Sequence, residues 1–133
     1  MTENGVYVRS AGAWQSMWRG ESATVTPASG FTGSRAIARR SGPLAHLSGA
    51  LVASAPATVT TGFTVVGTLP DFARPAVDPV LAQSRFFTVA IFGAGVAQLR
   101  ISTSGVVDIR ALTGTLSLVA GTAIYIDGVV YDV

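Results

Sequence analysis

Hydrophobic and polar residues alternate one by one over much of the chain, and this period of two is typical of β-strands with one buried face. In residues 42–52, Ala45 and Leu47 fall on one face and His46 falls on the other. Residues 58–69 repeat the pattern, so we expect a single strand there. Further strand candidates are the segments 6–15, 22–27, 35–40, 85–92, 98–102, 107–110, 116–118 and 124–130. Few segments have the period of a helix, so the pattern predicts an all-β fold with almost no helix.

Turn-forming residues separate the strand candidates. Ser104-Gly105 and Asp127-Gly128 are dipeptides that favour tight turns. Residues 70–79 contain three prolines, so we expect a loop there rather than a central strand. Many short strands at this spacing predict an antiparallel β-sandwich of jelly-roll-like character.

The chain has 133 residues, which is the length of one domain. We expect residues 21–133 to form the sandwich head. Residues 1–20 differ from the rest because Trp14 and Trp18 follow a Gly-Ala break. We therefore expect an N-terminal arm or stalk end in residues 1–20.

The low charge of the chain indicates an unusual surface. Only 12% of the residues are charged and 49% are hydrophobic, whereas globular proteins average about 25% charged residues. A chain of this size exposes much of its surface, so that surface must be apolar or hydroxyl-bearing in large part. Large exposed apolar patches mark interaction sites. Part of this surface is therefore expected to pack against copies of the same chain.

The residue types exclude several classes of site. There is no cysteine and only one histidine, so disulfides, thiolate metal sites and a multi-histidine metal site within one chain are excluded. We expect no cofactor, although a trimer would bring three copies of His46 together. His46 itself is expected at a solvent or interface position, because nothing in the sequence supplies a nucleophile and an orienting group beside it.

No membrane or export segment is evident in the sequence. The longest apolar stretch, residues 86–97, contains Thr88, Gly93 and Gly95, and it is shorter than the roughly 18 residues that a transmembrane helix needs. The chain opens on polar residues rather than on a basic and then apolar signal region. We therefore expect no membrane insertion.

The charged residues favour neither nucleic acid binding nor catalysis. The formal net charge is only +2 and all nine basic residues are arginines, so we expect no nucleic acid partner. A glycoside hydrolase needs two carboxyl groups that flank the scissile bond, and Asp71 and Asp78 are the one pairing that merits naming. Asp108 and Asp127 are expected to serve strand edges and turns. The sequence therefore predicts that the protein is not an enzyme.

Five passages, in this order, resemble those of a known family. They are residues 6–14, which read V-Y-V-R-S-A-G-A-W; residues 44–51; residues 68–75, which read T-L-P-D-F-A-R-P; residues 105–109, with Ser104 where the family often has Asp; and the closing residues Tyr125, Ile126 and Tyr131. Over nearly its whole length the chain is similar to the small C-terminal receptor-binding heads of phage tail fibres and minor tail proteins.

The resemblance carries expectations about architecture and role. Members of that family are β-sandwich heads that assemble as homotrimers at the tip or side of a phage tail. They bind polysaccharides or proteins of the host surface and contact other tail proteins, and they have no catalytic residues. The resemblance thus implies a virion location and an extracellular action.

Two groups of residues are candidates for ligand contact. Arg39 and Arg40, together with Arg35, form the one basic cluster, and arginine suits the carboxylates or phosphates of anionic cell-wall polymers. The loop that holds Asp71 and Asp78 is the second candidate. The alternative interpretation of the arginines is an ion pair between subunits or a solvated strand face.

A third group is expected at the trimer interface. Trp14 and Trp18 are expected in the core or in an interface at the junction of stalk and head, near the three-fold axis. Phe86 and Phe92 are expected to be exposed in a monomer, as are Val106 and Leu44, because all four lie on the strand face opposite the main apolar set.

Three functions compete at this stage. The first is a receptor-binding or adhesion head that acts without catalysis, with cell-wall polysaccharide as the expected target. The second is a purely structural tail or decoration domain that contacts only other proteins. The third, a polysaccharide-degrading tail enzyme, is disfavoured because no convincing acid–base pair is present.

Overall fold

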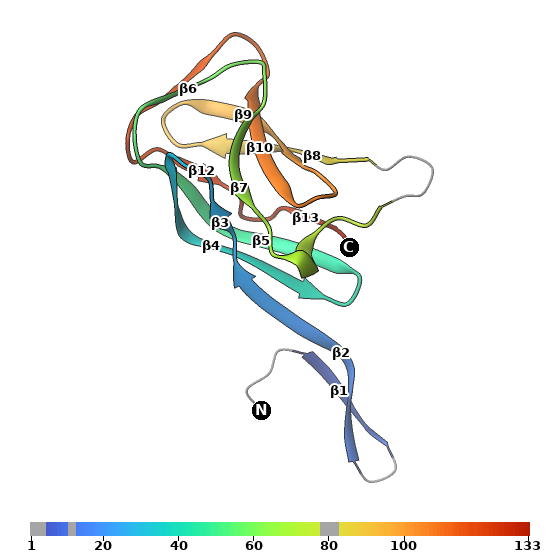
Figure 1. The fold of residues 1–133 in the computed structure, drawn as a ribbon. Helices are drawn as coiled ribbons and strands as arrows, with labels where there is room; N and C mark the ends of the chain where they lie inside the picture. Colours follow the sequence, from blue (N-terminus) through green and yellow to red (C-terminus); the bar gives the residue numbers. More distant parts are fainter. Residues whose placement is uncertain (1–4, 11–12, 78–82) are drawn as a thin grey trace.

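The computed structural model describes residues 5–10, 13–77 and 83–133, and up to residue 19 it describes the backbone alone. Nearly all regular structure in these residues is antiparallel β (Figure 1). The elements are β1 (Gly5–Ser10), β2 (Ala13–Thr24), β3 (Thr26–Pro27), β4 (Phe31–Ser41), β5 (Leu44–Ala53), β6 (Ala57–Val59), β7 (Thr64–Thr68), the 3-10 turn η1 (Asp71–Ala73), β8 (Arg85–Ile91), β9 (Gly95–Ile101), β10 (Val106–Ala111), β11 (Leu116–Leu118), β12 (Ala123–Tyr125) and β13 (Val130–Asp132). The predicted all-β fold is confirmed.

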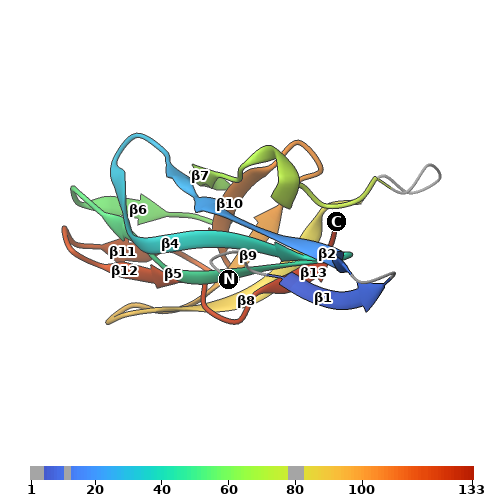
Figure 2. The ribbon, with the colours of Figure 1, turned by 90° about the horizontal axis from the view of Figure 1, so that it is seen from below.

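One long sheet folds back on itself to make the sandwich. Its strands follow the order β1-β2-β4-β5-β12-β8-β9-β10-β7-β3, with β13 beside β5 and a separate pair of β6 and β11. At Val25 the chain passes from β2, which pairs with β4, to β3, which pairs with β7 at the other end of this order. Val25 N–H donates to Ala36 O on the β4 side, and Ala28 N–H donates to Val66 O on the β7 side. The sheet is therefore nearly closed. Figure 2 shows β4 and β5 running side by side across the head.

The core lies between the facing halves of the sheet. In β9, Ala97, Leu99 and Ile101 are buried while Gln98 and Arg100 are partly exposed, as the alternation predicts. The largest fully buried side chains are Leu47, Leu51, Leu99, Ile101, Ile109, Leu118, Ile124 and Ile126. Each such side chain contributes about 1.5–3 kcal/mol by leaving water.

A bulge divides the β4–β5 pair into two halves. The register shifts between Ser34 and Ile37, opposite Gly49. Gly49 has a φ of +85°, and a Cβ there would lie 2.0 Å from the Arg35 carbonyl oxygen. Its N–H donates a 2.7 Å hydrogen bond to Oδ1 of Asp127. Only glycine fits this position, and the expectation that Asp127 serves a turn is confirmed.

The prediction of a single strand over residues 58–69 is wrong. The chain forms β6, bends at residues 60–63 and then forms β7. The Gly62 N–H donates to the Thr60 hydroxyl at 3.1 Å, which is a local bond that competes with strand pairing. β6 pairs with β11, whereas β7 pairs with β10. The period of two continues across residues 60–63 in the sequence, so the pattern does not reveal that β6 and β7 are separate strands with different partners.

The N-terminal strands leave the head as a hairpin. β1 pairs with β2 from Gly5↔Arg19 to Ser10↔Ala13, and β2 then enters the head and pairs with β4 from Gly20 to Thr24. Figure 1 shows the hairpin pointing away from the head. The segment expected to be an arm thus includes this hairpin, and its independence as a unit stays a prediction. In the part of the chain that the structure describes, no helix is long and apolar enough to cross a membrane.

Candidate functional site

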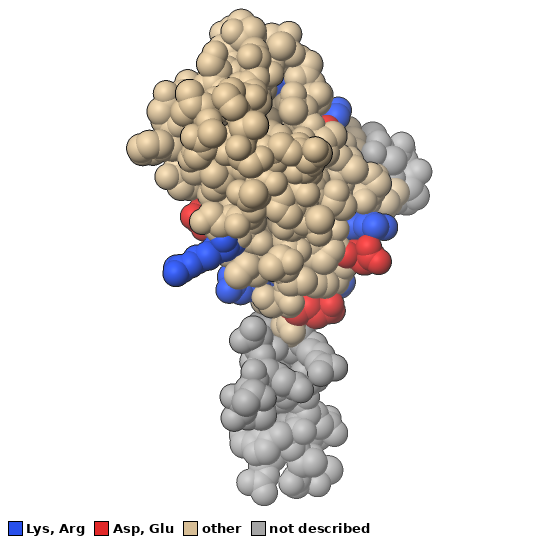
Figure 3. Space-filling view, turned by 60° about the vertical axis from the view of Figure 1, so that its left-hand side comes forward, with Lys and Arg blue, Asp and Glu red and all other residues tan. Residues whose placement is uncertain are grey.

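The head has a charged end and an uncharged end. Residues 41–70, 86–99 and 111–126 contain no Asp, Glu, Lys or Arg. These stretches supply β6, β11 and the β8–β9 turn, which Figure 1 shows at the part of the head away from the β1–β2 hairpin. In the space-filling view most of the visible charge gathers near the hairpin and the far part is nearly free of it (Figure 3). We call the far part the distal end and the other part the hairpin end.

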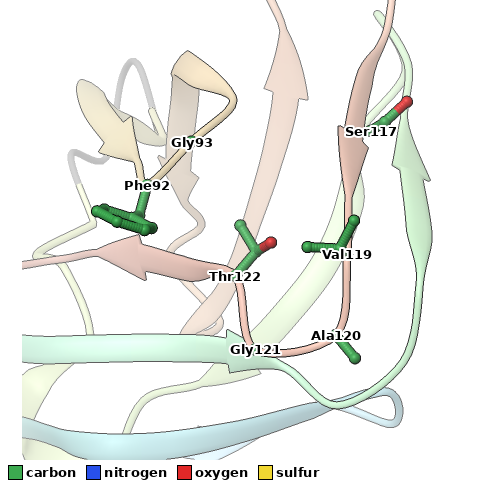
Figure 4. Close-up of a pocket in the computed structure, with 7 residues that line it drawn as sticks. All are labelled: Phe92, Gly93, Ser117, Val119, Ala120, Gly121 and Thr122. Atoms are coloured by element: carbon green, nitrogen blue, oxygen red, sulfur yellow. The ribbon is translucent and has the colours of Figure 1, made fainter.

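A hollow of about 330 Å³ opens at the distal end. It is lined by Phe92, Gly93, Ser117, Val119, Ala120, Gly121 and Thr122. In Figure 4 the Thr122 side chain stands between the Phe92 ring and Val119, whereas the Ala120 side chain points away. Phe92 and Val119 are 69% and 67% exposed, while Thr122 is buried.

Two tight turns hold the walls of the hollow. Thr122 N–H donates to Val119 O at 3.0 Å, and Gly121 N–H donates to Ala53 O at 2.7 Å. On the other wall, Phe92 N–H donates to Ala123 O at 3.0 Å. These backbone bonds tie the turn before β12 to the end of β8, so the hollow is formed before any ligand arrives.

The hollow is lined by uncharged side chains. Its lining has no carboxylate, imidazole, thiol or guanidinium group. The hydroxyl of Thr122 has no hydrogen-bond partner among the described residues, yet it is not sealed from solvent. The described residues also contain no group of three or more His, Cys, Asp or Glu side chains that could hold a metal ion. An apolar hollow with a few polar groups is typical of small-ligand sites.

The arginines predicted to contact a ligand lie at the hairpin end and do not form one surface. Successive side chains of a strand point to opposite faces, so β4 directs Arg39 and Arg40 to opposite sides. Arg39 Nη1 donates to Ser48 Oγ at 3.1 Å, and Arg40 Nε donates to Gly42 O at 3.0 Å. Arg35 is exposed at the bulge, where its φ is +53°.

Asp71, the described acid of the predicted loop, does not line the hollow. Asp71 begins η1, which packs beside β4, and its carboxylate pairs with Arg74 at 2.8 Å. This pair is well exposed to solvent. Asp78 lies outside the described residues, so its place relative to Asp71 stays untested.

The predicted interface residues fall in three places. Trp14 and Trp18 lie in the hairpin part of β2, and their side chains are outside the description. Phe86 begins the outer face of β8 and is 51% exposed, while Phe92 lines the hollow. Leu44 is exposed as expected, whereas Val106 is half-buried. Whether any of them contacts a second copy stays a prediction.

The structure reveals a charged cluster that sequence reasoning missed. Asp108 was expected at a strand edge, but it lies in β10 between β9 and β7 and is only 4% exposed. Arg100 grips its two carboxylate oxygens at 2.9 and 2.6 Å. These hydrogen bonds raise the pKa of Arg100 above its usual value. The expectation for Asp108 is therefore wrong, because a cross-strand arginine satisfies the buried carboxylate.

Phe63 covers this cluster from the bend before β7. The guanidinium carbons of Arg100 and Arg110 lie 3.7 and 4.9 Å from the centre of its ring. Arg110 Nε also donates to Gln98 Oε1 at 2.7 Å. Cation–π contacts of this kind stabilise a guanidinium that has lost water.

A second cluster fastens the start of the loop that follows η1. Arg85 Nε donates to Asp132 Oδ1 at 2.9 Å, Arg85 Nη2 donates to Ala76 O, and the buried Tyr131 hydroxyl donates to Ala73 O at 2.7 Å. The hydrogen bond from Arg85 holds the pKa of Asp132 below its usual value, and burial raises the pKa of Tyr131.

Comparison with known proteins gives one structural neighbour to report. No family model and no curated protein sequence matches the chain. The crystal structure of the receptor binding protein (gp15) of Listeria phage PSA is similar, with a TM-score of 0.52 and 22% sequence identity. The match covers 81% of this chain but just under two thirds, 66%, of the phage protein. At this level of identity the two proteins share a fold, and what the phage protein binds is not thereby carried over to this chain.

Proposed function

We propose that the chain is a receptor-binding head of a phage tail, which attaches to the host surface without cutting it. The observation that carries the proposal is the shared fold with the receptor binding protein of Listeria phage PSA, over 81% of this chain. The passages in the sequence that resemble tail-fibre heads point the same way. The target is a cell-wall polysaccharide.

The two ends of the head support this role. The β1–β2 hairpin leaves one end and offers a connection to the rest of a tail. The other end carries the preformed hollow, whose lining contains no charged residue. A head held at one end therefore presents a binding site at the other.

The same site favours adhesion over hydrolysis. Glycoside hydrolysis uses two carboxyl groups about the scissile bond, and the lining of the hollow has none. Asp71, the one described member of the pair considered from the sequence, is exposed and paired with Arg74. The head binds its target and leaves the chain length of that target unchanged.

The assembly is a homotrimer, and one exposed sheet face supports it. Phe86 of β8 lies across from Arg100 of β9, which lies across from Asp108 of β10, which lies across from Val65 of β7. Phe86, Val96 and Val65 are about half exposed on this face. Burial of the exposed half of each would contribute about half of the roughly 1.5–3 kcal/mol of a whole side chain, and closed symmetric assembly is the usual way to achieve it.

Binding to cells tests the receptor role. Fluorescently labelled protein is added to intact cells and cell-wall fractions of a panel of bacteria that includes Listeria. The proposal expects saturable binding to some strains that survives protease treatment of the wall and is lost after periodate oxidation of its sugars. Binding lost after protease instead would identify a protein receptor. Binding to purified tails but to no cell wall would identify the structural alternative.

Sedimentation tests the assembly. We expect a species of three chains at micromolar concentration, and Phe86→Asp should dissociate or aggregate it because a carboxylate would be buried in the interface. Thr32→Asp, on an exposed residue of β4 in the other half of the sheet, serves as the control. A 13.6 kDa monomer for the unaltered protein would refute the trimer.

A further inference from the structure

We infer that the distal hollow binds one uncharged sugar unit of the host polysaccharide, an assignment that rests on the proposed receptor role. This places the ligand away from the arginines that the sequence favoured. It also gives Phe92 a ligand-binding role instead of the interface role expected from the sequence. Three properties of the hollow carry the inference.

The first property is an exposed aromatic ring beside a fixed backbone. Phe92 is 69% exposed, and its N–H is bonded to Ala123 O. An aromatic ring has a negative face that attracts the slightly positive C–H groups on one side of a sugar ring. Because the backbone is held, a ligand has to order only the side-chain torsions of Phe92.

The second property is a free hydroxyl at the floor. Thr122 is 5% exposed, and its hydroxyl has no hydrogen-bond partner among the described residues. Figure 4 places this side chain between Phe92 and Val119. A hydroxyl can both donate and accept a hydrogen bond, as can each hydroxyl of a sugar. An apolar side chain from a protein partner would leave the Thr122 hydroxyl without a bond.

The third property is the absence of charge. A phosphate or carboxylate ligand would need arginine or a similar donor, and no charged residue lines the hollow. The strands and turns around it, in residues 41–70, 86–99 and 111–126, contain none either. An anionic polymer would gain nothing here, so the unit recognised in the hollow is uncharged.

The size of the hollow sets the ligand size. Its 330 Å³ lies near the lower limit of small-ligand pockets, which span roughly 300–1,000 Å³. A stable contact with a protein needs about 1,200 Å² or more of buried surface. A unit of the size of a sugar ring fills the hollow, and the rest of the polymer lies outside it.

The test is a titration followed by NMR amide spectra of the intact protein. The probes are neutral methyl glycosides of hexoses, 6-deoxyhexoses and N-acetylhexosamines, with a hexose phosphate as the charged comparator. We expect at least one neutral glycoside to shift amides of Phe92, Val119 and Thr122. Its affinity should stay the same from about 0.05 M to about 0.5 M salt, because salt screens only charged contacts.

Three variants locate the site. Phe92→Ala should weaken the glycoside about tenfold or more, and Thr122→Val should weaken it about threefold to tenfold, since one loses the stacking ring and the other a hydroxyl bond. Tyr125→Ala removes an exposed aromatic residue outside the hollow and should change the affinity less than about twofold. Thermal melting of all three checks that they fold.

Each outcome decides the inference. Absence of shifts in the hollow with every neutral glycoside would overturn it, as would tighter, salt-sensitive binding of the hexose phosphate. Dissociation of the trimer by Phe92→Ala would return that residue to the interface. If wall binding is observed but Phe92→Ala leaves it unchanged, the inference fails and the receptor role stands. If glycosides bind the hollow but no cell wall is bound, the receptor role fails and the sugar site stands.

Discussion

The two ends of the head are held together by different means. At the hairpin end, side chains do much of the holding: Arg85 clamps Asp132, Tyr131 bonds Ala73 O, and Arg40 bonds Gly42 O. At the distal end, backbone hydrogen bonds hold the turns in place, such as the one that Gly121 N–H donates to Ala53 O. The charged end is therefore fastened by its own side chains, whereas the uncharged end keeps its side chains free for contact.

This difference explains how so few charges suffice. Charged side chains are costly to order and costly to bury unless they are paired. Three of the described acids, Asp71, Asp108 and Asp132, each have an arginine partner. A surface of alanine, threonine, serine and a few exposed apolar residues is left at the distal end, and it can meet a neutral ligand without first breaking an ion pair.

The largest expected loss of stability is at the bulge in the β4–β5 pair, opposite Gly49. Gly49→Ala would place a Cβ 2.0 Å from Arg35 O at a φ of +85°. Backbone strain and the forced shift of β4 should cost about 3–5 kcal/mol, and the variant should melt far below the unaltered protein or fail to fold. Gly30→Ala has a φ of +87° but open space around the new Cβ. It should cost only about 1–2 kcal/mol. Equal losses of stability in the two variants would contradict the close contact between Gly49 and the Arg35 carbonyl.

The next effect is in the cluster under Phe63. Asp108→Ala removes both hydrogen bonds to Arg100, whose side chain is 32% exposed. Because water reaches Arg100 in part, we expect a loss of about 2–3 kcal/mol rather than the larger cost of a fully buried unpaired charge. The control is Arg74→Ala in the exposed pair with Asp71, which should cost less than about 1 kcal/mol. Urea titrations of both variants measure the difference.

Alternation identified much of the fold because it depends on neighbouring residues. The hairpin of β9 and β10 was evident from Leu99, Ile101 and the Ser104-Gly105 turn, and the structure places both side chains in the core. The same rule gives the correct face for Asp108, which lies across from Arg100 and Val65 on the outer face of the sheet, but it did not predict that this side chain is buried. Arg100 binds both carboxylate oxygens of Asp108, and Phe63, from a bend far away in the sequence, lies against the Arg100 guanidinium. Local alternation carries no information about such distant neighbours.

The hollow could not be predicted for the same reason. Its two walls, at Phe92 and at residues 117–122, meet because β12 pairs with β8 through Ile124 and Ile91. No local motif marks that pairing. The charge-free stretch of residues 111–126 was visible in the sequence, and it is the signal that could have directed attention to this end instead of to the arginines.

A smaller loss of stability is expected from the buried hydrogen bond between the Tyr131 hydroxyl and Ala73 O at the hairpin end. Burial raises the pKa of Tyr131 above that of an unfolded tyrosine, which is about 10. Its contribution to stability is therefore complete below about pH 10 and falls by about 1.4 kcal/mol per pH unit as the pH rises further toward the folded pKa. Tyr131→Phe should lose about 1–2 kcal/mol at neutral pH, through the unpaired Ala73 carbonyl, and should lack that alkaline decline. Tyr125→Phe should retain it, and an identical alkaline decline in both variants would contradict the assignment.

The smallest loss of stability is expected from the exposed ion pair between Arg85 and Asp132, beside the same loop. The hydrogen bond from Arg85 lowers the pKa of Asp132 below that of an unfolded aspartate, which is about 3.9. The bridge therefore stabilises the fold above about pH 4, and its contribution is lost as the pH falls through the lower, folded pKa. Asp132→Asn should melt slightly below the unaltered protein at neutral pH, and the gap should close in acid because the carboxylate is then protonated in both states. NMR titration of the Asp132 carboxyl carbon gives its pKa directly. A melting gap that persists unchanged down to about pH 2 would show that the loop depends on the packing of Tyr131 and not on the charge of Asp132.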